Sequence, residues 1–237
     1  MEGKEILIVK NISREGPDLL AEVLKERGIP YTVTELTKGE DFPPTDDYGA
    51  VVVLGGPDSA NDENDKMKNQ LARIHEAIEA RKPYLGICLG FQTLVKARGG
   101  KVVKSPIKEV GLKGPDGNHF TVHLTEDGKR DPLFEGIDET LNTFHLHGET
   151  VELTDDMTLL GVGKFCRNQV AKIGTNAYGL QCHFELTPEK FEVLMNEDDD
   201  LQRLDKARLR ADFEAIRDNY TRTGRQLFRN FLKIAGF

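Results

Sequence analysis

A chain of 237 residues, of which 38% are hydrophobic and 30% charged, can bury a full core and is not expected to be disordered or fibrous. The formal net charge is −8, and basic residues are interleaved with acidic ones, which argues against a nucleic-acid partner. The apolar run that begins at Ile6 follows a glutamate and has no cleavage site after it, and no run approaches membrane-spanning length. We therefore expect a cytoplasmic protein with no membrane partner.

Short apolar runs alternate with amphipathic stretches in the N-terminal half, which predicts strands joined by helices into a parallel sheet. The expected strands cover residues 5–10, 30–36, 48–54 and 84–88, and the expected helices cover residues 17–28, 63–81 and 89–97. The unbroken apolar run from Ala50 to Leu54 is typical of a strand covered on both faces, so we expect it at the centre of the sheet.

The pattern changes after residue 100. Short strands separated by Gly, Asp and Asn predict an antiparallel or mixed portion, over residues 120–124, 157–162 and 169–173. A further strand is expected over residues 178–183. We expect one domain over residues 1–237, with an α/β core over 1–190 whose mostly parallel sheet carries helices on both faces.

A helical C-terminal extension is predicted over residues 191–237. Apolar residues recur in it at helical spacing, which favours packing against the core over packing against a partner: Phe213, Ile216, Tyr220, Leu227, Phe231 and Leu232. The acidic segment 196–200 is interpreted as a solvated loop or helix start without a function.

Cys88 lies where a predicted strand runs straight into a predicted helix, with Gly86 and Gly90 on either side. This G-x-C-x-G pattern is the cysteine form of the nucleophile elbow, a strained turn that presents a reactive side chain. The start of the helix would lower the pKa of the thiol, and the N–H of Leu89 could donate to an oxyanion. The alternative is a buried structural cysteine.

A cysteine nucleophile needs a base and a group that orients the base. His183 stands at the end of a predicted strand, and Glu185, two residues on, would lie on the same side of an extended chain. Taken alone, such a pair is more often an ordinary surface pair. The ends of parallel strands meet at one edge of a sheet, so Cys88 and His183 could meet there.

The other two cysteines, Cys166 and Cys182, are interpreted as inert. Three cysteines are an odd and sparse set, which argues against disulfides and for a reducing compartment. Neither cysteine shows zinc-ligand spacing, and we expect no metal and no cofactor.

Three motifs together resemble the class I, or triad, glutamine amidotransferases. The elbow at 86–90 matches the family's G-x-C-x-G, the segment 183–185 matches its H-x-E, and the segment 55–59 matches its G-G-P-x-S loop. The motifs stand in the family's order, and the resemblance covers residues 1 to about 190. It implies a flavodoxin-like fold.

One branch of the family resembles this chain most, the branch related to the glutaminase portion of GMP synthase. Its W-H-G-D segment is similar to residues 144–149, with Glu149 in place of Asp. A second departure is Phe184, where the family most often has a proline that stiffens the turn between His and Glu.

The resemblance implies roles for individual residues. Cys88 would be the nucleophile, His183 the base and Glu185 its orienter, while the N–H groups of Gly56 and Leu89 would hold the oxyanion. Substrate contact is implied for two more residues. Gln92 would touch the amino-acid end of the substrate, unless it only lies on a half-exposed helix, and His147 would lie near the bound glutamine or be structural.

Three functions stay open. The first is a glutaminase that hydrolyses the γ-amide of glutamine through a cysteine thioester and supplies ammonia to a separate synthetase. The second is an autonomous hydrolase of γ-glutamyl amides or peptides. The third is a regulatory protein without turnover. Such a protein would have no chemical need for a nucleophile, a base and an orienter together. Neither the ammonia acceptor nor the oligomeric state follows from the sequence.

Overall fold

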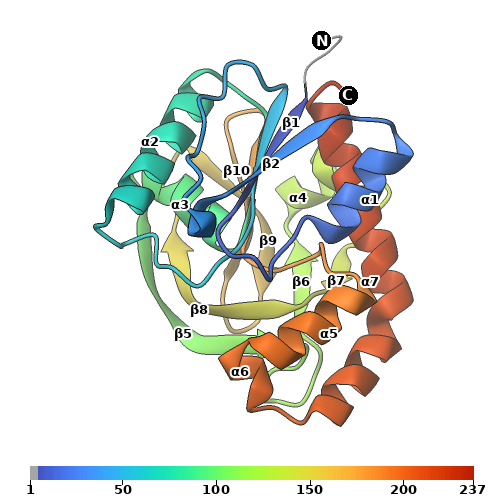
Figure 1. Cartoon of the computed structure of the whole chain (residues 1–237). Helices are drawn as coiled ribbons and strands as arrows, with labels where there is room; N and C mark the ends of the chain where they lie inside the picture. Colours follow the sequence, from blue (N-terminus) through green and yellow to red (C-terminus); the bar gives the residue numbers. More distant parts are fainter. Residues whose placement is uncertain (1–4) are drawn as a thin grey trace.

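The structure is a computed structural model that describes residues 5–237. Residues 1–4, on which part of the signal-peptide judgement rests, lie outside the described residues. A sheet of nine strands in the order β2-β1-β3-β4-β11-β10-β9-β6-β7 runs through the molecule, with helices on both of its faces (Figure 1). The predicted fold class, a mixed and largely parallel α/β sheet, is confirmed.

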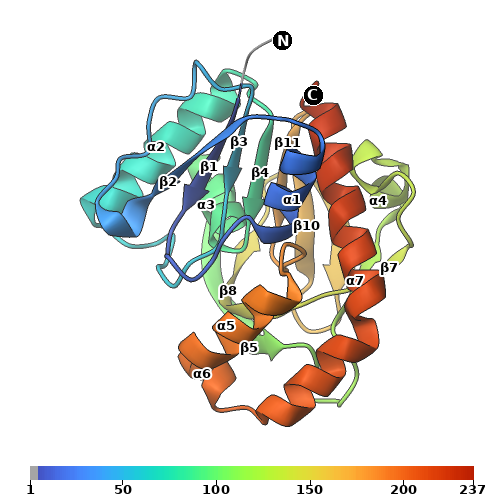
Figure 2. The same ribbon diagram turned by 45° about the vertical axis from the view of Figure 1, so that its right-hand side comes forward.

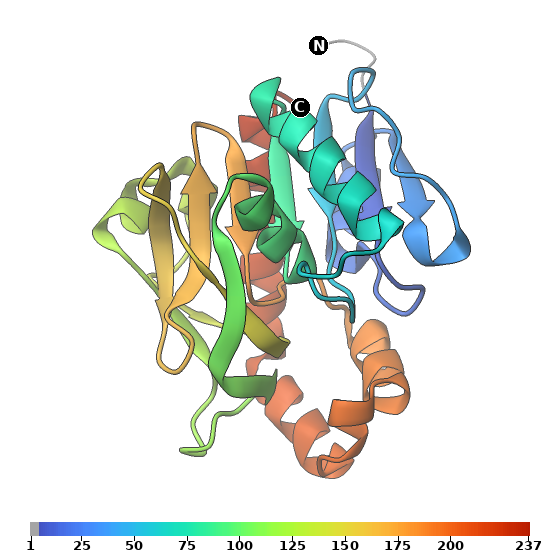
Figure 3. The same cartoon turned by 90° about the vertical axis from the view of Figure 1, so that its left-hand side faces the viewer.

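Five neighbouring strands form the parallel part of this sheet: β2 (Tyr31–Glu35), β1 (Ile6–Lys10), β3 (Ala50–Val53), β4 (Tyr84–Ile87) and β11 (Ala177–Leu180). Helices α1 (Asp18–Glu26) and α7 (Lys206–Ile234) cover one face, and α2 (Asp65–Glu79) and α3 (Leu89–Ala97) cover the other, as Figures 2 and 3 show from two sides. The apolar run at 50–54 contains β3, which lies inside the sheet between β1 and β4, as predicted.

Both faces of strand β1 are apolar because helices cover the sheet on both sides. Ile6 and Ile8 point into the hydrophobic cluster beneath α1 and α7, whereas Leu7 and Val9 point into the cluster beneath α2 and α3. All four side chains are fully buried. Because side chains alternate along a strand, a sheet with helices on both faces needs apolar residues at every position.

The antiparallel part of the sheet was also predicted in outline. It consists of β10 (Asn168–Ile173), β9 (Met157–Gly163), β6 (Thr121–Leu124) and the unpredicted β7 (Thr140–Asn142). Three short helical segments connect strands of the sheet. They are η1 (Leu36–Lys38) after β2, and α4 (Glu126–Arg130) and η2 (Pro132–Phe134) between β6 and β7.

A separate two-stranded ribbon of β5 (Lys101–Gly111) and β8 (His145–Glu152) was not predicted as a unit. Strand β5 contains Pro106 and several lysines, which are uncommon inside strands, so the sequence pattern does not indicate a strand here. Its register with β8 shifts between Lys104 and Glu109, so the proline lies where the regular pairing is broken.

The C-terminal extension is helical, as predicted, with α5 (Pro188–Glu197), α6 (Asp199–Gln202) and α7. The apolar face expected to pack on the core does so, and its six predicted residues are all buried. Among the helices formed by residues 5–237, none combines the length and hydropathy that crossing a bilayer requires.

The acidic segment 196–200 contains a helix start, one of the two predicted alternatives, because Asp198 caps α6. Asp198 itself is not solvated, since it is 7% exposed and forms an ion pair of 2.9 Å with Arg14. One prediction about local structure was wrong. The strand predicted over 178–183 ends at Leu180, so Cys182 and His183 lie beyond it. The ladder stops there because β4, its parallel neighbour, ends at Ile87 and turns into α3.

Candidate functional site

The candidate site lies at the carboxyl edge of the parallel strands. The loops after β1 and β3 and the turn after β4 line a cavity of about 380 Å³ there, and the segment after β11 lies next to Cys88. The ribbon β5–β8 and the start of α6 form the other walls of the cavity. The residues that matter below line it together: Glu15, Gly56, Cys88, Gln92, His147 and Asp198.

Cys88 occupies the turn between β4 and α3 with φ 52° and ψ −106°, a backbone conformation that side chains rarely adopt. The strand and the helix approach so closely that a Cβ on Gly86 would meet the carbonyl of Gly90, and one on Gly90 would meet the carbonyl of Val53. Positions 86 and 90 therefore have room for glycine only. The strained turn places Cys88 at the start of α3, as the elbow pattern predicts.

His183 and Glu185 form a buried pair. Nδ1 of His183 lies 2.6 Å from Oε1 of Glu185, and each residue is 2% exposed. Burial by itself lowers the pKa of His183, but the Glu185 carboxylate and the neighbouring Cys88 more than offset it and raise that pKa well above the usual value. Nε2 has no hydrogen-bond partner among residues 5–237, so this nitrogen is available to a substrate or to Cys88.

The turn that carries His183 and Glu185 is held from both sides. The N–H of Phe184 donates to the second carboxylate oxygen of Glu185 at 3.0 Å, a bond that a proline at this position could not make. The hydroxyl of Tyr220 on α7 donates to the His183 carbonyl at 3.1 Å and accepts from the N–H of Leu186 at 3.3 Å. These hydrogen bonds hold the turn in place without the proline that the family most often has at the position of Phe184.

The two predicted oxyanion donors are neighbours. A Cβ on Gly56, in the loop after β3, would lie 3.4 Å from Cδ2 of Leu89. Leu89 is the first residue of α3, so its N–H has no carbonyl partner within the helix. Both residues adjoin the Cys88 turn.

Gln92 is only 4% exposed, so the interpretation as a half-exposed surface glutamine is wrong. Its Nε2 donates to the carbonyl of Glu149 at 3.1 Å and approaches Oε1 of Gln181 at 3.4 Å. Gln181 in turn points its Nε2 at Sγ of Cys88 from 3.8 Å, and Leu146 presents its carbonyl oxygen at the same distance. Sequence reasoning missed Gln181, although it lies two residues before His183.

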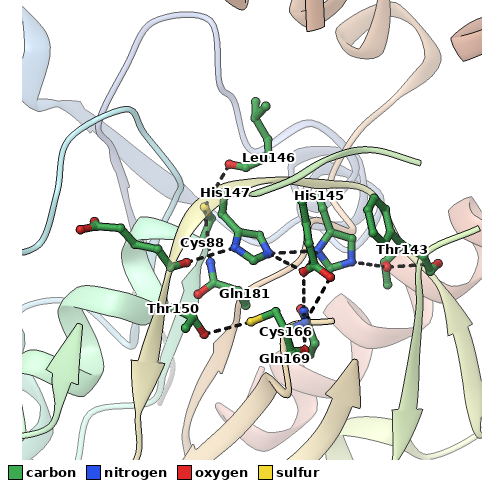
Figure 4. A network of polar contacts seen from close by, with 12 residues as sticks. Cys88, Thr143, His145, Leu146, His147, Thr150, Cys166, Gln169 and Gln181 are labelled. Carbon is green, nitrogen blue, oxygen red and sulfur yellow. Dashed lines mark hydrogen bonds and ion pairs between the residues drawn. The ribbon is translucent and has the colours of Figure 1, made fainter. Parts of the chain in front are cut away.

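His147 lines the cavity and also belongs to a buried polar network (Figure 4). Its Nδ1 lies 3.0 Å from the Glu149 carbonyl, and its Nε2 lies 2.9 Å from Oε2 of Glu109 and 3.2 Å from Nδ1 of His145. His147 faces the cavity from a structural network.

One corner of this network could hold a metal ion. The ligand atoms of Glu109, His147 and Cys166 lie within 4.8 Å of one another, and all three residues are buried. Sequence reasoning found no ligand spacing because the three come from β5, β8 and the loop before β10. Each also has a protein partner, and Cys166 Sγ lies 3.0 Å from the Thr150 hydroxyl.

Asp18 begins α1 beside the His183–Glu185 turn, and the N–H of Leu19 donates to the Glu185 carbonyl at 2.9 Å. Burial, opposed by Lys190, raises the pKa of Asp18 to about 7. The folded chain therefore binds a proton between about pH 4 and 7 that the unfolded chain does not bind, so this group makes stability fall as pH rises through that range.

We expect the free energy of unfolding to fall by on the order of 2 kcal/mol between pH 5 and 8 through Asp18, and Asp18→Asn to remove this part. Asparagine suits the φ of 32° at this position. Urea unfolding at several pH values measures the slope. The exposed Asp155→Asn is the control and should keep the wild-type slope, whereas an unchanged slope in Asp18→Asn would contradict the assignment.

Comparison with known proteins identifies the family. The family model "Glutamine amidotransferase class-I" matches residues 17–199. The chain belongs to this family. It is 34% identical over 177 residues to the glutamine amidotransferase-like protein YfeJ of Salmonella typhimurium, an alignment that covers 72% of this chain and 71% of YfeJ.

Two further matches bear on length and fold. The glutamine-hydrolysing GMP synthase of Aquifex aeolicus is 30% identical over 201 residues, which cover 83% of this chain but 36% of that enzyme. The chain thus spans about a third of the GMP synthase. A crystal structure of a glutamine amidotransferase from Thermotoga maritima superposes with a TM-score of 0.86 at 24% identity over 98% of this chain and 100% of that one, so the two share a fold.

Proposed function

We propose that this chain hydrolyses the γ-amide of glutamine through a thioester on Cys88. The observation that carries the proposal is the strained Cys88 at the start of α3, set in a cavity beside the buried His183–Glu185 pair. Backbone strain at a cavity is typical of a functional site, and a nucleophile beside an oriented base is the arrangement that acyl transfer needs.

In the first step, the Cys88 thiolate attacks the γ-carbonyl carbon of glutamine. The N–H groups of Gly56 and Leu89 donate to the oxyanion that forms. The carbon–nitrogen bond then breaks as His183 gives its Nε2 proton to the departing nitrogen, and ammonia leaves a γ-glutamyl thioester. The raised pKa of His183 supports this role, because it favours the imidazolium that must hold the proton.

In the second step, neutral His183 takes a proton from water as the oxygen attacks the thioester carbonyl. The carbon–sulfur bond breaks, glutamate leaves, and Cys88 returns to its thiolate. Glu185 keeps the His183 ring in one orientation through both steps, since its carboxylate is bonded to Nδ1.

Substrate contact is proposed for Gln92 and His147. Both lie on the wall of the cavity near the Glu149 carbonyl, which would place the amino-acid end of glutamine between α3 and β8. We propose a separate synthetase as the partner that receives the ammonia, and the three free cysteines suit the reducing cytoplasm.

The alternative, autonomous hydrolysis of γ-glutamyl amides or peptides, has an observation of its own. The C-terminal extension completes the cavity, because Asp198 and Asp200 line it and bind Arg14 and Lys108 of the core. The chain therefore supplies this wall of the site itself, without a partner.

The test is release of ammonia and glutamate by the purified chain from glutamine and from γ-glutamyl peptides, with and without candidate synthetases. We expect glutamine hydrolysis in both cases, faster with the true synthetase. Preference for a peptide, unaffected by any synthetase, would favour the autonomous enzyme. No hydrolysis of either substrate under any condition would reject both enzymes and leave the regulatory protein.

A further inference from the structure

Glu15 is a buried carboxylate that the proposed reaction leaves unused. It stands in the loop between β1 and α1, is 7% exposed, and lines the cavity that contains Cys88. Its Oε2 is shielded from solvent and has no hydrogen-bond partner among residues 5–237. The neighbouring Arg14 binds Asp198 through Nη2 at 2.9 Å, and its Nε likewise has no hydrogen-bond partner among residues 5–237.

Gly55 shows where this carboxylate points. The position that a Cβ would take on Gly55 is filled by Oε2 of Glu15, and the same point lies 3.2 Å from Cε1 of His183 and 3.4 Å from Cβ of Cys88. Glycine at position 55 thus makes room for the carboxyl group. A side chain would drive Glu15 away from His183 and Cys88.

An unpaired buried carboxylate is costly unless something in the working enzyme binds it. Burial raises the pKa of Glu15, and the nearby His183 opposes this rise, so the charges of the two groups are coupled. A second carboxylate, Glu185, already orients Nδ1 of His183. The partner of Glu15 is therefore expected to arrive with the substrate.

We propose that Glu15 is a further residue of the active site, one that accepts a hydrogen bond from the scissile amide nitrogen and so makes the enzyme selective for amides. This rests on the proposed function. Oε2 of Glu15 lies at the Gly55 position that is 3.2 Å from Cε1 of His183, so this carboxyl oxygen lies beside the His183 ring. The side next to His183 is where the nitrogen departs.

The hydrogen bond gains strength during the reaction. The amide nitrogen of glutamine carries N–H groups but little positive charge, whereas the same nitrogen gains positive charge as His183 transfers its proton and before the carbon–nitrogen bond has fully broken. A carboxyl oxygen at this place stabilises the transition state more than the bound substrate. The proton still comes from His183, and Glu15 transfers none.

The test compares two leaving groups. The γ-methyl ester of glutamate forms the same thioester but has an oxygen in place of the nitrogen and offers no N–H. We expect Glu15→Ala to lower kcat/KM for glutamine by about 10- to 100-fold and for the ester by less than about threefold. Glu15→Gln, whose amide oxygen still accepts, should fall between Glu15→Ala and the wild type on glutamine.

Glu35→Gln is the matched control. Glu35 is 5% exposed and accepts a hydrogen bond from Ser13 in the same loop, but it lies outside the residues that line the cavity. Its replacement should keep the wild-type ratio of the two kcat/KM values. Circular dichroism and urea unfolding report whether Glu15→Ala folds; if it does not, the same ratio is read in Glu15→Gln.

Two outcomes separate the claims. A wild-type protein that hydrolyses both substrates, with variants that lose activity on both equally or on neither, overturns the role of Glu15 and leaves the proposed function intact. A wild-type protein that hydrolyses neither substrate overturns the proposed function, and the role of Glu15 falls with it.

Discussion

Replacing Cys88 with alanine is expected to lower kcat for glutamine hydrolysis by at least about 10,000-fold, because no other group in the site can form the thioester. Cys88 is the residue whose backbone is strained at the cavity, and its Sγ lies 3.8 Å from the Leu146 carbonyl oxygen and 3.8 Å from Nε2 of Gln181. An ammonia-release assay with glutamine measures the loss.

Cys182→Ala is the control for this variant. Cys182 is fully buried in the core, and burial raises the pKa of its thiol well above the usual value, so it should be unreactive. Its replacement should change kcat by less than about threefold. Activity that survives in Cys88→Ala and disappears in Cys182→Ala would mean that the wrong cysteine has been assigned.

Glu185→Gln is expected to lower kcat/KM by about 100- to 10,000-fold, because the amide neither holds the correct His183 tautomer nor supports the imidazolium. The sign of the pH effect follows from the structure. Glu185 raises the pKa of His183 against the opposing effect of burial, so its loss lets that pKa fall. The proton that His183 must give to the departing nitrogen is then lost at a lower pH.

The dependence of kcat/KM for glutamine on pH measures this shift directly. The alkaline limb of the profile should lie at a lower pH in Glu185→Gln than in the wild type. Glu189→Gln, an exposed acid in the first turn of α5, is the control and should leave the profile in place. A Glu185→Gln profile that coincides with the wild type would show that Glu185 does not act on His183.

Much of this fold could be predicted because the local pattern and the global structure agree. The fully apolar run at 50–54 has one stable place, in a strand with helices on both faces, and the spacing of apolar residues in 213–232 matches the face that α7 buries. The division into a core over 1–190 and an extension over 191–237 stays a prediction.

The site could be predicted where its chemistry is local in sequence. The elbow around Cys88 and the pair His183–Glu185 each lie within a few residues, and parallel strand ends bring the two segments to one edge. Glu15 could not be found in this way. Its contact with Gly55 joins the loop after β1 to the loop after β3, and a Glu-Gly pair before a proline has no distinctive spacing.

The Glu109–His147–Cys166 cluster could not be predicted from the sequence for the same reason. Its three residues come from β5, β8 and a loop. The pairing of β5 with β8 brings the first two together, and it was not predicted because β5 contains a proline. The burial of Asp198 was misjudged because an acidic run is usually solvated. Here one member of the run is paired with Arg14 from the far end of the chain.

The most direct test of the central claim is mass spectrometry of the protein quenched in acid during glutamine turnover. The thioester predicts a mass increase equal to one γ-glutamyl group on the peptide that contains Cys88, present in the wild type and absent in Cys88→Ala. Glutamine turnover with no adduct on Cys88, or with the adduct on Cys166 or Cys182, would contradict the assignment of Cys88 as the nucleophile.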